Sequence, residues 1–175
     1  GRRIGSSLAS ISAYLEATGF AYEIVVVDDG SSDDTHAIIA AAGVRDGHLR
    51  IIAYTPNRGK GYAVRTGMLA ARGEYHMFLD ADLSIPITLA NDLLRELQGG
   101  YDIAIASRWH PLSSQAVRPP LARRVMGSVF RWCVRQLVVS KVRDTQCGCK
   151  AYRAEVSRRL FALSQIERFS FDAEV

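Results

Sequence analysis

The sequence predicts an α/β fold in which a mostly parallel central sheet is flanked by helices. Two observations carry this prediction. Segments with helical apolar spacing alternate along the chain with short, strongly apolar segments that are typical of buried strands. In addition, a polar cluster follows each predicted strand, as expected where the carboxyl ends of parallel strands share one edge of a sheet. These clusters should therefore converge on one crevice.

The elements follow one another as helix and strand in turn. Helices are predicted at residues 3–18, after the polar turn at residues 28–35 up to Gly43, at 62–71 and from 86 to about 97, and strands at 22–27, 49–54, 75–79 and 102–106. Glycines end three of these helices, namely Gly19, Gly43 and Gly73. Residues 143–150 are expected to be a loop or a strand edge, and Val156, Leu160 and Leu163 indicate a final helix.

The size and composition fit one globular domain. The chain has 175 residues, of which 48% are hydrophobic and 23% charged. A sheet of this type usually starts with a strand, so we expect the first strand to be missing and the domain to be truncated at both ends. The net charge of +4 suits anionic partners such as nucleotides, lipid phosphates or an anionic membrane surface.

The strand at residues 75–79 ends at two carboxylates, Asp80 and Asp82. Side chains at i and i+2 of a strand face the same way, so the two charges should repel unless a cation lies between them. Mg²⁺ or Mn²⁺ carrying phosphate oxygens would suit this pair. The alternative is that both residues form the next turn and cap the helix after Pro86.

Several common sites are excluded by spacing. The sequence contains neither a P-loop nor the Gly-X-Gly-X-X-Gly dinucleotide motif, and its four histidines are scattered. The three cysteines, Cys133, Cys147 and Cys149, form no framework, so we expect reduced structural thiols.

A basic stripe marks the helix predicted at residues 121–139. Arg124, Arg131 and Arg135 lie on one face, opposite large apolar residues. This pattern fits a solvated helix face and an amphipathic helix at a membrane surface or phosphorylated lipid equally well. A nucleic-acid partner is not expected, because the segment has few aromatic residues for base stacking.

Taken together, these motifs resemble the family-2 glycosyltransferases of the GT-A fold. The resemblance rests on residues 25–33 (Val-Val-Val-Asp-Asp-Gly-Ser-Ser-Asp), 57–61 (Asn-Arg-Gly-Lys-Gly) and 80–82 (Asp-Ala-Asp). Residues 106–108 and 144–148 narrow it to the branch that transfers a sugar to a polyprenyl phosphate, most similar to dolichyl-phosphate β-glucosyltransferases. The family's first strand would precede Gly1. Residues 1–108 would then bind the nucleotide sugar, and residues 109–175 the acceptor.

The resemblance assigns roles to individual residues. The nucleotide would be bound by Asp28, Asp29, Arg58, Lys60 and Asp80. Mg²⁺ or Mn²⁺ would be held by Asp80 and Asp82. Catalytic roles would fall to Asp82, Arg108 and Asp172. The acceptor phosphate would be bound by Arg108, Arg123, Arg124, Arg131 and Gln146. A base such as Asp144 or Asp172 would be essential only for a hydroxyl acceptor, because a phosphate is already ionised.

The expected reaction is an inverting transfer of a hexose to a polyprenyl or dolichyl phosphate at the cytosolic face of a membrane. UDP-glucose is the favoured donor, with GDP-mannose as the alternative. Two other readings stay open, namely transfer to a sugar hydroxyl in polysaccharide synthesis and a non-catalytic module that binds a nucleotide sugar or lipid phosphate.

Overall fold

The computed structural model describes residues 2–107 and 147–175, and all structural statements refer to these residues. The helices are α1 (Arg2–Thr18), α2 (Thr35–Arg45), α3 (Lys60–Ala70), α4 (Ala90–Gln98) and α6 (Ala154–Leu163), with short 3₁₀ helices η1 (Ile87–Leu89) and η2 (Phe169–Ala173). The strands are β1 (Ile24–Asp29), β2 (Leu49–Tyr54), β3 (Tyr75–Leu79), β4 (Ile103–Ile105) and β5 (Cys149–Arg153).

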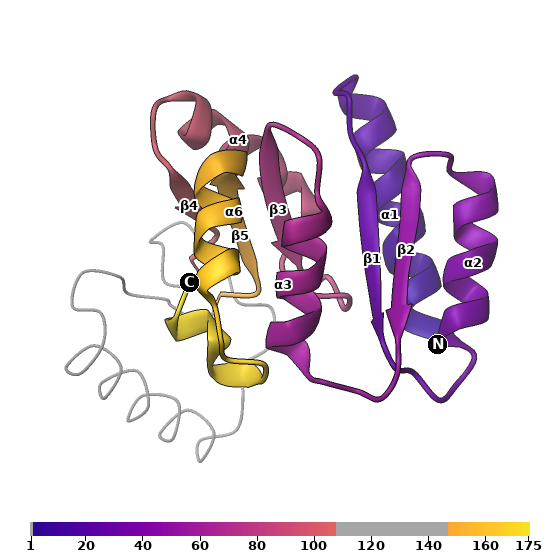
Figure 1. Cartoon of the computed structure of the whole chain (residues 1–175). Helices are drawn as coiled ribbons and strands as arrows, with labels where there is room; N and C mark the ends of the chain where they lie inside the picture. Colours follow the sequence, from indigo (N-terminus) through magenta and orange to yellow (C-terminus); the bar gives the residue numbers. More distant parts are fainter. Residues whose placement is uncertain (1, 108–146) are drawn as a thin grey trace, which may run out of the picture.

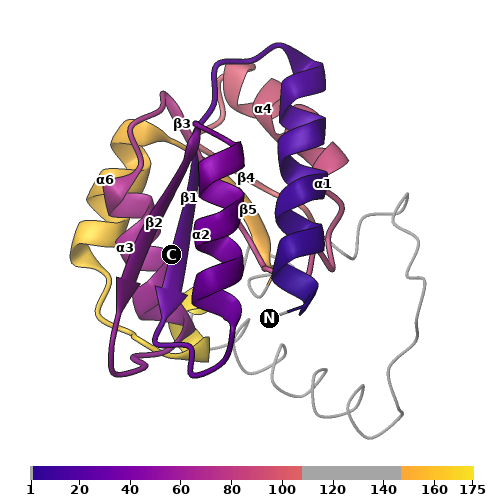
Figure 2. The same ribbon diagram turned by 90° about the vertical axis from the view of Figure 1, so that its right-hand side faces the viewer.

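The described strands form two sheets with helices on both faces. β1 and β2 pair in parallel, whereas β5 lies between β3 and β4 and is antiparallel to both. In Figures 1 and 2, α3 and α6 lie on one face of the sheets, and α1 and α4 lie on the other. This confirms the predicted α/β fold with flanking helices. The predicted strand before residue 1 stays a prediction.

The main error of the sequence-based assignment is β5. We predicted a loop or strand edge near residue 150, but Cys149–Arg153 is the middle strand of its sheet, and four of its five residues are buried. A strand from the predicted acceptor half is thus part of the sheet of the predicted nucleotide half. The division of the chain into two functional halves stays a prediction.

Smaller corrections concern helix ends and faces. α2 passes through Gly43 and ends at Arg45, and α3 begins at Lys60, two residues before its predicted start. The final helix is confirmed as α6, but Leu163 is 76% exposed, and Phe161, which is not part of the predicting pattern, is buried.

Three apolar clusters hold the layers together. One packs α1 and α2 on β1 and β2 around Leu8 and Ile39, and the second packs α4 on the other sheet around Leu97. The third joins α3 and α6 around Phe161 and Phe171. Each fully buried large apolar side chain stabilises the fold by about 1.5–3 kcal/mol.

The cysteines inside the described part of the chain fit the predicted structural role. Cys147 and Cys149 are both buried, and no disulfide joins them. Burial raises the pKa of Cys149 to about 12, so this thiol stays protonated and chemically inert near neutral pH. Cys133 lies outside the described residues.

Buried His76 should make the protein sensitive to acid. Its Nδ1 lies 2.9 Å from Oγ of Ser157, and burial lowers its pKa in the folded state. The unfolded chain then binds a proton, near pH 6.5, before the folded one, so stability is full above that pH and is lost as the pH falls below it. The loss is at most about 1.4 kcal/mol per pH unit.

Urea unfolding at pH 7.5 and pH 5.5 would measure this effect. The His76→Gln variant should lose less stability between the two pH values than the wild type. An equal loss in both proteins would show that another group is responsible.

Candidate functional site

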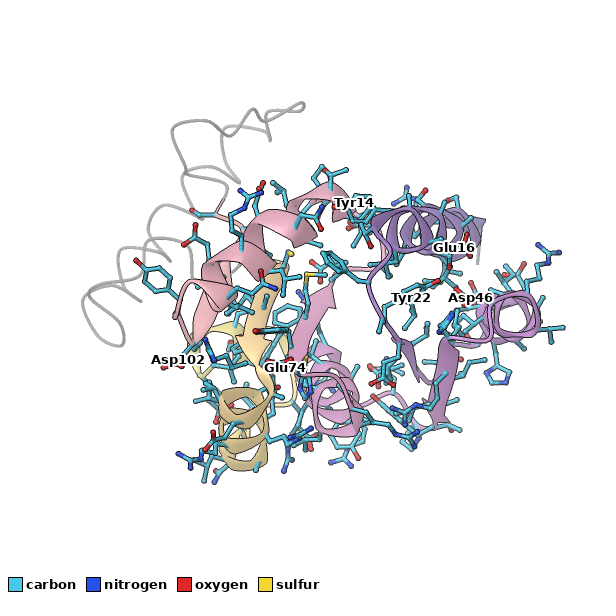
Figure 3. All side chains as sticks on the ribbon, turned by 90° about the horizontal axis from the view of Figure 1, so that it is seen from above. Tyr14, Glu16, Tyr22, Asp46, Glu74 and Asp102 are labelled. Atoms are coloured by element: carbon cyan, nitrogen blue, oxygen red, sulfur yellow. The ribbon has the colours of Figure 1, made fainter. Side chains whose placement is uncertain are left out.

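A cavity of about 480 Å³ lies at the carboxyl ends of β1 and β2. It is lined by Asp28, Gly30, Ser31, Ser32, His36, Ala53, Tyr54 and Thr55. Figure 3 shows the molecule from above, at the amino-terminal ends of the strands, which lie opposite the cavity. Among the labelled residues, those that come shortly before β1, β2, β3 and β4 are Tyr22, Asp46, Glu74 and Asp102. The predicted convergence of polar residues at the carboxyl ends is therefore confirmed for β1 and β2.

Asp28 is the buried carboxylate of this cavity. Its Oδ1 accepts a hydrogen bond from the Ser31 N–H at 3.0 Å, and its Oδ2 lies 3.3 Å from Nδ1 of His36. Burial by itself would raise the pKa of Asp28, but the contacts with Ser31 and His36 together lower it. Asp28 is thus an ionised acceptor at the wall of a cavity, where it can accept hydrogen bonds from a ligand.

Asp29 anchors the loop that follows β2. Its Oδ1 accepts a hydrogen bond from the Arg58 N–H at 2.7 Å, and its Oδ2 accepts from the Gly59 N–H and the Asn57 amide, each at 2.8 Å. Gly59 has a φ of 103°, a conformation that favours glycine. These bonds fix the Asn-Arg-Gly-Lys-Gly loop, so the predicted nucleotide contact of Asp29 would be additional to an observed structural role.

Aromatic rings continue the cavity wall towards the loop. The guanidinium of Arg58 lies 3.6 Å from the ring centroid of Tyr62, and that ring meets Tyr54 edge-on at 5.1 Å. Arg58 also forms an ion pair with Glu167. The sequence-predicted Arg58 therefore lies beside the cavity, held in place on two sides.

The segment 164–175 folds against this loop as a strap. The Glu174 carboxylate accepts hydrogen bonds from the Ser164 hydroxyl at 3.0 Å and from the Gln165 and Ile166 N–H groups at 2.8 and 3.0 Å. Burial would raise the pKa of Glu174, but these bonds lower it. The Tyr62 N–H donates to the Glu167 carbonyl at 3.0 Å, which joins the strap to α3.

Gly61 is the position at which strap and helix touch most closely. A Cβ at Gly61 would lie 2.3 Å from the Ile166 carbonyl oxygen and 2.8 Å from Cβ of Phe171. Because a backbone atom cannot rotate away, Gly61→Ala should displace the strap and cost about 2–3 kcal/mol in free energy of unfolding, as overpacked sites do. Urea unfolding measures this loss.

Gly67→Ala in the same helix is the matched control. There the only near atom is Cγ2 of Val27 at 3.1 Å, which is part of a side chain. Alanine also has the better helix propensity, so this variant should lose clearly less stability than Gly61→Ala. Equal losses in the two variants would contradict the close contact at Gly61.

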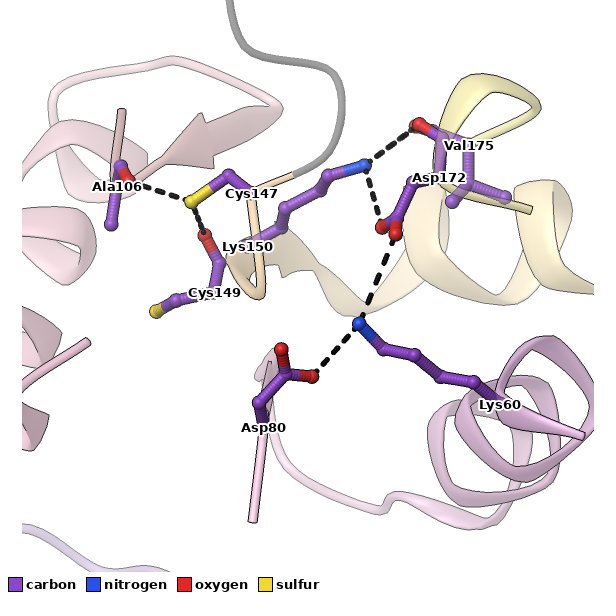
Figure 4. Close-up of polar contacts among 8 residues, drawn as sticks. All are labelled: Lys60, Asp80, Ala106, Cys147, Cys149, Lys150, Asp172 and Val175. Carbon is purple, nitrogen blue, oxygen red and sulfur yellow. Dashed lines mark hydrogen bonds and ion pairs between the residues drawn. The ribbon is translucent and has the colours of Figure 1, made fainter. Parts of the chain in front are cut away.

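A chain of alternating charges runs from Lys150 in β5 through Asp172 in the strap and Lys60 to Asp80 at the end of β3, as Figure 4 shows. Lys150 Nζ lies 3.4 Å from Oδ1 of Asp172, and Lys60 Nζ lies 3.9 Å from Oδ2 of the same residue. Lys60 Nζ also lies 2.9 Å from Oδ1 of Asp80. The structure thus brings together three predicted site residues, Lys60, Asp80 and Asp172, and adds Lys150.

The two ends of this chain differ in burial. Lys150 is 1% exposed and donates to the carbonyl oxygens of Asp172 and Val175 at 3.0 and 3.3 Å. Burial lowers the pKa of Lys150 and raises that of Asp172, so the pair depends on mutual contact to stay charged. The side chain of Asp80, at the other end, is 32% exposed and open to ligands.

Asp80 and Asp82 supply oxygen ligands of the kind that a hard divalent cation prefers, but they do not lie on one strand as predicted, because β3 ends at Leu79 and Asp82 lies in the turn after it. Asp82 is exposed, and its Oδ1 accepts a hydrogen bond from the Ser84 N–H at 3.0 Å, which is the turn role expected as the alternative. Beside Asp80, a Cβ on residue 148 would lie 2.2 Å from Oδ2, so Gly148 leaves room for this carboxylate. No cluster of three metal-ligating side chains occurs in residues 2–107 and 147–175. Phosphate and water oxygens would therefore complete the coordination.

The remaining predicted site residues lie outside the described residues. They are Arg108, Arg123, Arg124, Arg131, Asp144 and Gln146. Their roles stay predictions, as do those of the basic helix.

Sequence reasoning missed His36, Tyr54, Gly148, Lys150 and Glu174. Gly148 lies in the motif at residues 144–148, and Lys150 follows it by two positions, so closeness to the motif was a usable signal for both. His36, by contrast, was dismissed as a scattered histidine, and no local pattern marked Glu174.

Comparison with known proteins is decisive for the family. A model described as glycosyl transferase family 2 matches residues 2–161. The chain belongs to this family. Among curated members, the dolichyl-phosphate beta-glucosyltransferase of Drosophila melanogaster is 34% identical over 187 residues, covering 99% of this chain and 57% of that protein. The Homo sapiens enzyme of the same name is 35% identical over 164 residues, covering 89% and 51%.

The fold of this family-2 chain also matches solved structures. Glucosyl-3-phosphoglycerate synthase from Mycobacterium tuberculosis in complex with UDP has a TM-score of 0.67 at 22% identity, covering 97% of this chain and 57% of that one. The predicted GT-A fold is thereby confirmed. The chain spans about half the length of the curated relatives it matches.

Proposed function

We propose that this family-2 chain transfers glucose, with inversion, from UDP-glucose to a polyprenyl or dolichyl phosphate. The observation that carries the proposal is that one edge of the fold joins a cavity of nucleoside size to an open carboxylate. Asp28 lies in the cavity, and the adjacent Asp29 holds the loop whose Lys60 reaches Asp80. A nucleoside in the cavity would thus have its diphosphate directed towards the 80–82 turn.

The names of the relatives support the choice of substrates. The relatives at 34–36% identity are named dolichyl-phosphate beta-glucosyltransferases. A structure that shares the fold, at 22% identity, was solved with Mn²⁺, UDP-glucose and phosphoglyceric acid. From the sequence relatives we infer that the donor of this chain is UDP-glucose and that its acceptor is a lipid phosphate.

In the proposed reaction an oxygen of the acceptor phosphate forms a bond to the anomeric carbon while the bond from that carbon to UDP breaks. Asp28 would bind the nucleoside, and Arg58 and Lys60 would lie near the diphosphate. A divalent cation on Asp80 and Asp82 would act as a Lewis acid that stabilises the charge of the leaving diphosphate. Mg²⁺ and Mn²⁺ both suit these oxygen ligands.

The environment of Asp172 favours a phosphate acceptor over a sugar hydroxyl. A hydroxyl acceptor needs a general base, and the two candidates for it are Asp172 and Asp144, of which Asp144 lies outside the described residues. This side chain is only 5% exposed and lies between two ammonium groups, so it is an ion-pair partner and not an open base. A lipid phosphate needs no such base, because its second pKa is about 6.

The site of action that we propose is the cytosolic face of a membrane, where a lipid acceptor would be presented. Among the described residues no helix is long and apolar enough to cross a bilayer. We propose that the basic segment at residues 121–139 takes part in the association with the membrane surface.

A transfer assay would test the proposal. The full-length protein would be placed in vesicles containing polyprenyl phosphate, with labelled UDP-glucose or GDP-mannose, with and without Mn²⁺. We expect label in the lipid from UDP-glucose only, only with the metal, and a loss on the order of 100-fold in Asp82→Asn. Asp92→Asn, an exposed carboxylate on α4, is the matched control and should retain full activity.

The other outcomes each point elsewhere. Full activity of Asp82→Asn, or activity in EDTA, would overturn the metal assignment. Transfer from GDP-mannose alone would correct the donor. Saturable UDP binding without any lipid label would favour a hydroxyl acceptor or a non-catalytic binding module.

A further inference from the structure

Lys60 has two carboxylates within reach. Its ammonium lies 2.9 Å from Oδ1 of Asp80 and 3.9 Å from Oδ2 of Asp172 (Figure 4). The first distance is that of a charge-assisted hydrogen bond, and the second is a looser ion pair. A shift of about 1 Å would exchange the two, which is a small movement for a flexible four-carbon side chain.

Asp172 is held by a buried partner, whereas the Lys60 side chain is partly exposed. Lys150 lies on the Oδ1 side of Asp172 and is itself fixed by two backbone carbonyl oxygens. The Asp172 side chain is 5% exposed, compared with 24% for Lys60 and 32% for Asp80. The Lys60 ammonium therefore lies between a buried, fixed anion and a more open one, and its flexible four-carbon stem allows it to move between them.

We propose that the Lys60 ammonium occupies the cation position at Asp80 when the site is empty, and moves to Asp172 when a divalent cation binds. The inference rests on the metal pair of the proposed function, Asp80 and Asp82. Asp172 is then a positioning residue that acts through Lys60.

The physical reason is competition between two cations for one carboxylate. An ammonium and a divalent ion repel each other, and both are attracted to the oxygens of Asp80. If Lys60 had no second partner, metal binding would leave an ammonium unpaired in a partly buried site. Asp172 supplies that partner, so the divalent ion displaces Lys60 without leaving its charge uncompensated.

Two substitutions should change metal affinity in opposite directions. Lys60→Met keeps the length of the side chain and removes the competing charge, so the affinity for Mn²⁺ should rise about tenfold. Asp172→Asn removes the second partner and keeps Lys60 on Asp80, so the affinity should fall about three- to tenfold. A role in folding alone would not produce a gain in one variant and a loss in the other.

The test is a titration of the full-length protein with Mn²⁺ in the absence of nucleotide, with free Mn²⁺ measured by electron paramagnetic resonance. Arg95→Met and Asp92→Asn are the charge-matched controls, because both side chains are exposed on α4. Both controls should bind Mn²⁺ as the wild type does. Lys60→Met changes a partly exposed side chain and keeps the test decisive if Asp172→Asn does not fold.

The possible outcomes separate this inference from the proposed function. Equal Mn²⁺ affinity in the wild type and Lys60→Met would overturn the exchange and leave the metal pair standing. Absence of Mn²⁺ binding in every protein would overturn the metal pair itself, and the exchange with it. Binding of Mn²⁺ by Lys60→Met but not by the wild type would be the strongest support for competition between Lys60 and the metal at Asp80.

Discussion

Lys150→Met should destabilise the protein by about 3–5 kcal/mol, because it removes the nearer of two ion-pair partners of the buried Asp172 carboxylate and leaves only the looser contact with Lys60. Lys150 is 1% exposed, and its ammonium lies 3.4 Å from Oδ1 of Asp172. The same substitution removes the donor to the carbonyl oxygens of Asp172 and Val175, which lie in and after η2. Urea unfolding would measure the loss of free energy.

The double variant Lys150→Met with Asp172→Asn separates the cost of the lone charge from that of packing. Methionine is close to lysine in length, and asparagine is neutral, so the double variant should recover a large part of the loss. As the matched surface control, Arg159→Met breaks the exposed pair with Glu155 and should change stability little. If the double variant were as unstable as Lys150→Met alone, the unpaired charge would not be the cause.

Gly148→Ala should abolish most of the proposed transfer activity while the fold is largely retained. A Cβ at residue 148 would lie 2.2 Å from Oδ2 and 2.7 Å from Cγ of Asp80. The Asp80 N–H donates to the Gly148 carbonyl at 3.1 Å, so the two backbones cannot separate without losing this bond. The half-exposed Asp80 side chain would have to rotate away, and a displacement of about 1 Å at a reacting centre can cost 100-fold in rate.

Gly47→Ala is the matched control for this substitution. A Cβ at Gly47 meets no atom within 4 Å, so both activity and stability should stay at the wild-type level. Transfer would be measured with the vesicle assay, and the unfolding midpoint with urea. Full activity of Gly148→Ala would show that the position of the Asp80 carboxylate is not critical for transfer. Loss of folding would show that Gly148 is required for packing of the core.

The order of helices and strands could be predicted because it depends on the local spacing of apolar residues along the sequence. Apolar residues at a helical spacing identified α1, and β-branched runs identified β1 and β2. The polar turns after these strands were recognisable for the same reason, since each follows directly on an apolar run. Asp28, Arg58 and Asp80 were found in this way, together with the place of Asp82 in the turn after β3.

The role of a residue within its element was less predictable. Asp29 and Asp28 look equivalent in sequence, but Asp29 binds the loop at residues 57–59, while Asp28 faces the cavity. Side chains alternate along a strand, so neighbours point to different surroundings. Which surroundings lie on each side is decided by elements that are distant in sequence.

The α/β order, the family and the carboxylates at the strand ends could be predicted from the sequence, because each of these lies in a contiguous segment. The central position of β5 and the contact of the strap with the loop at residues 57–61 depend on the tertiary structure. Arg58 and Glu167 are 109 positions apart, and Lys150 becomes acceptable in a buried strand only because Asp172 lies beside it. Such ion pairs compensate charges between residues that are far apart in the sequence, and hydrophobic periodicity, which is a local pattern, does not predict them.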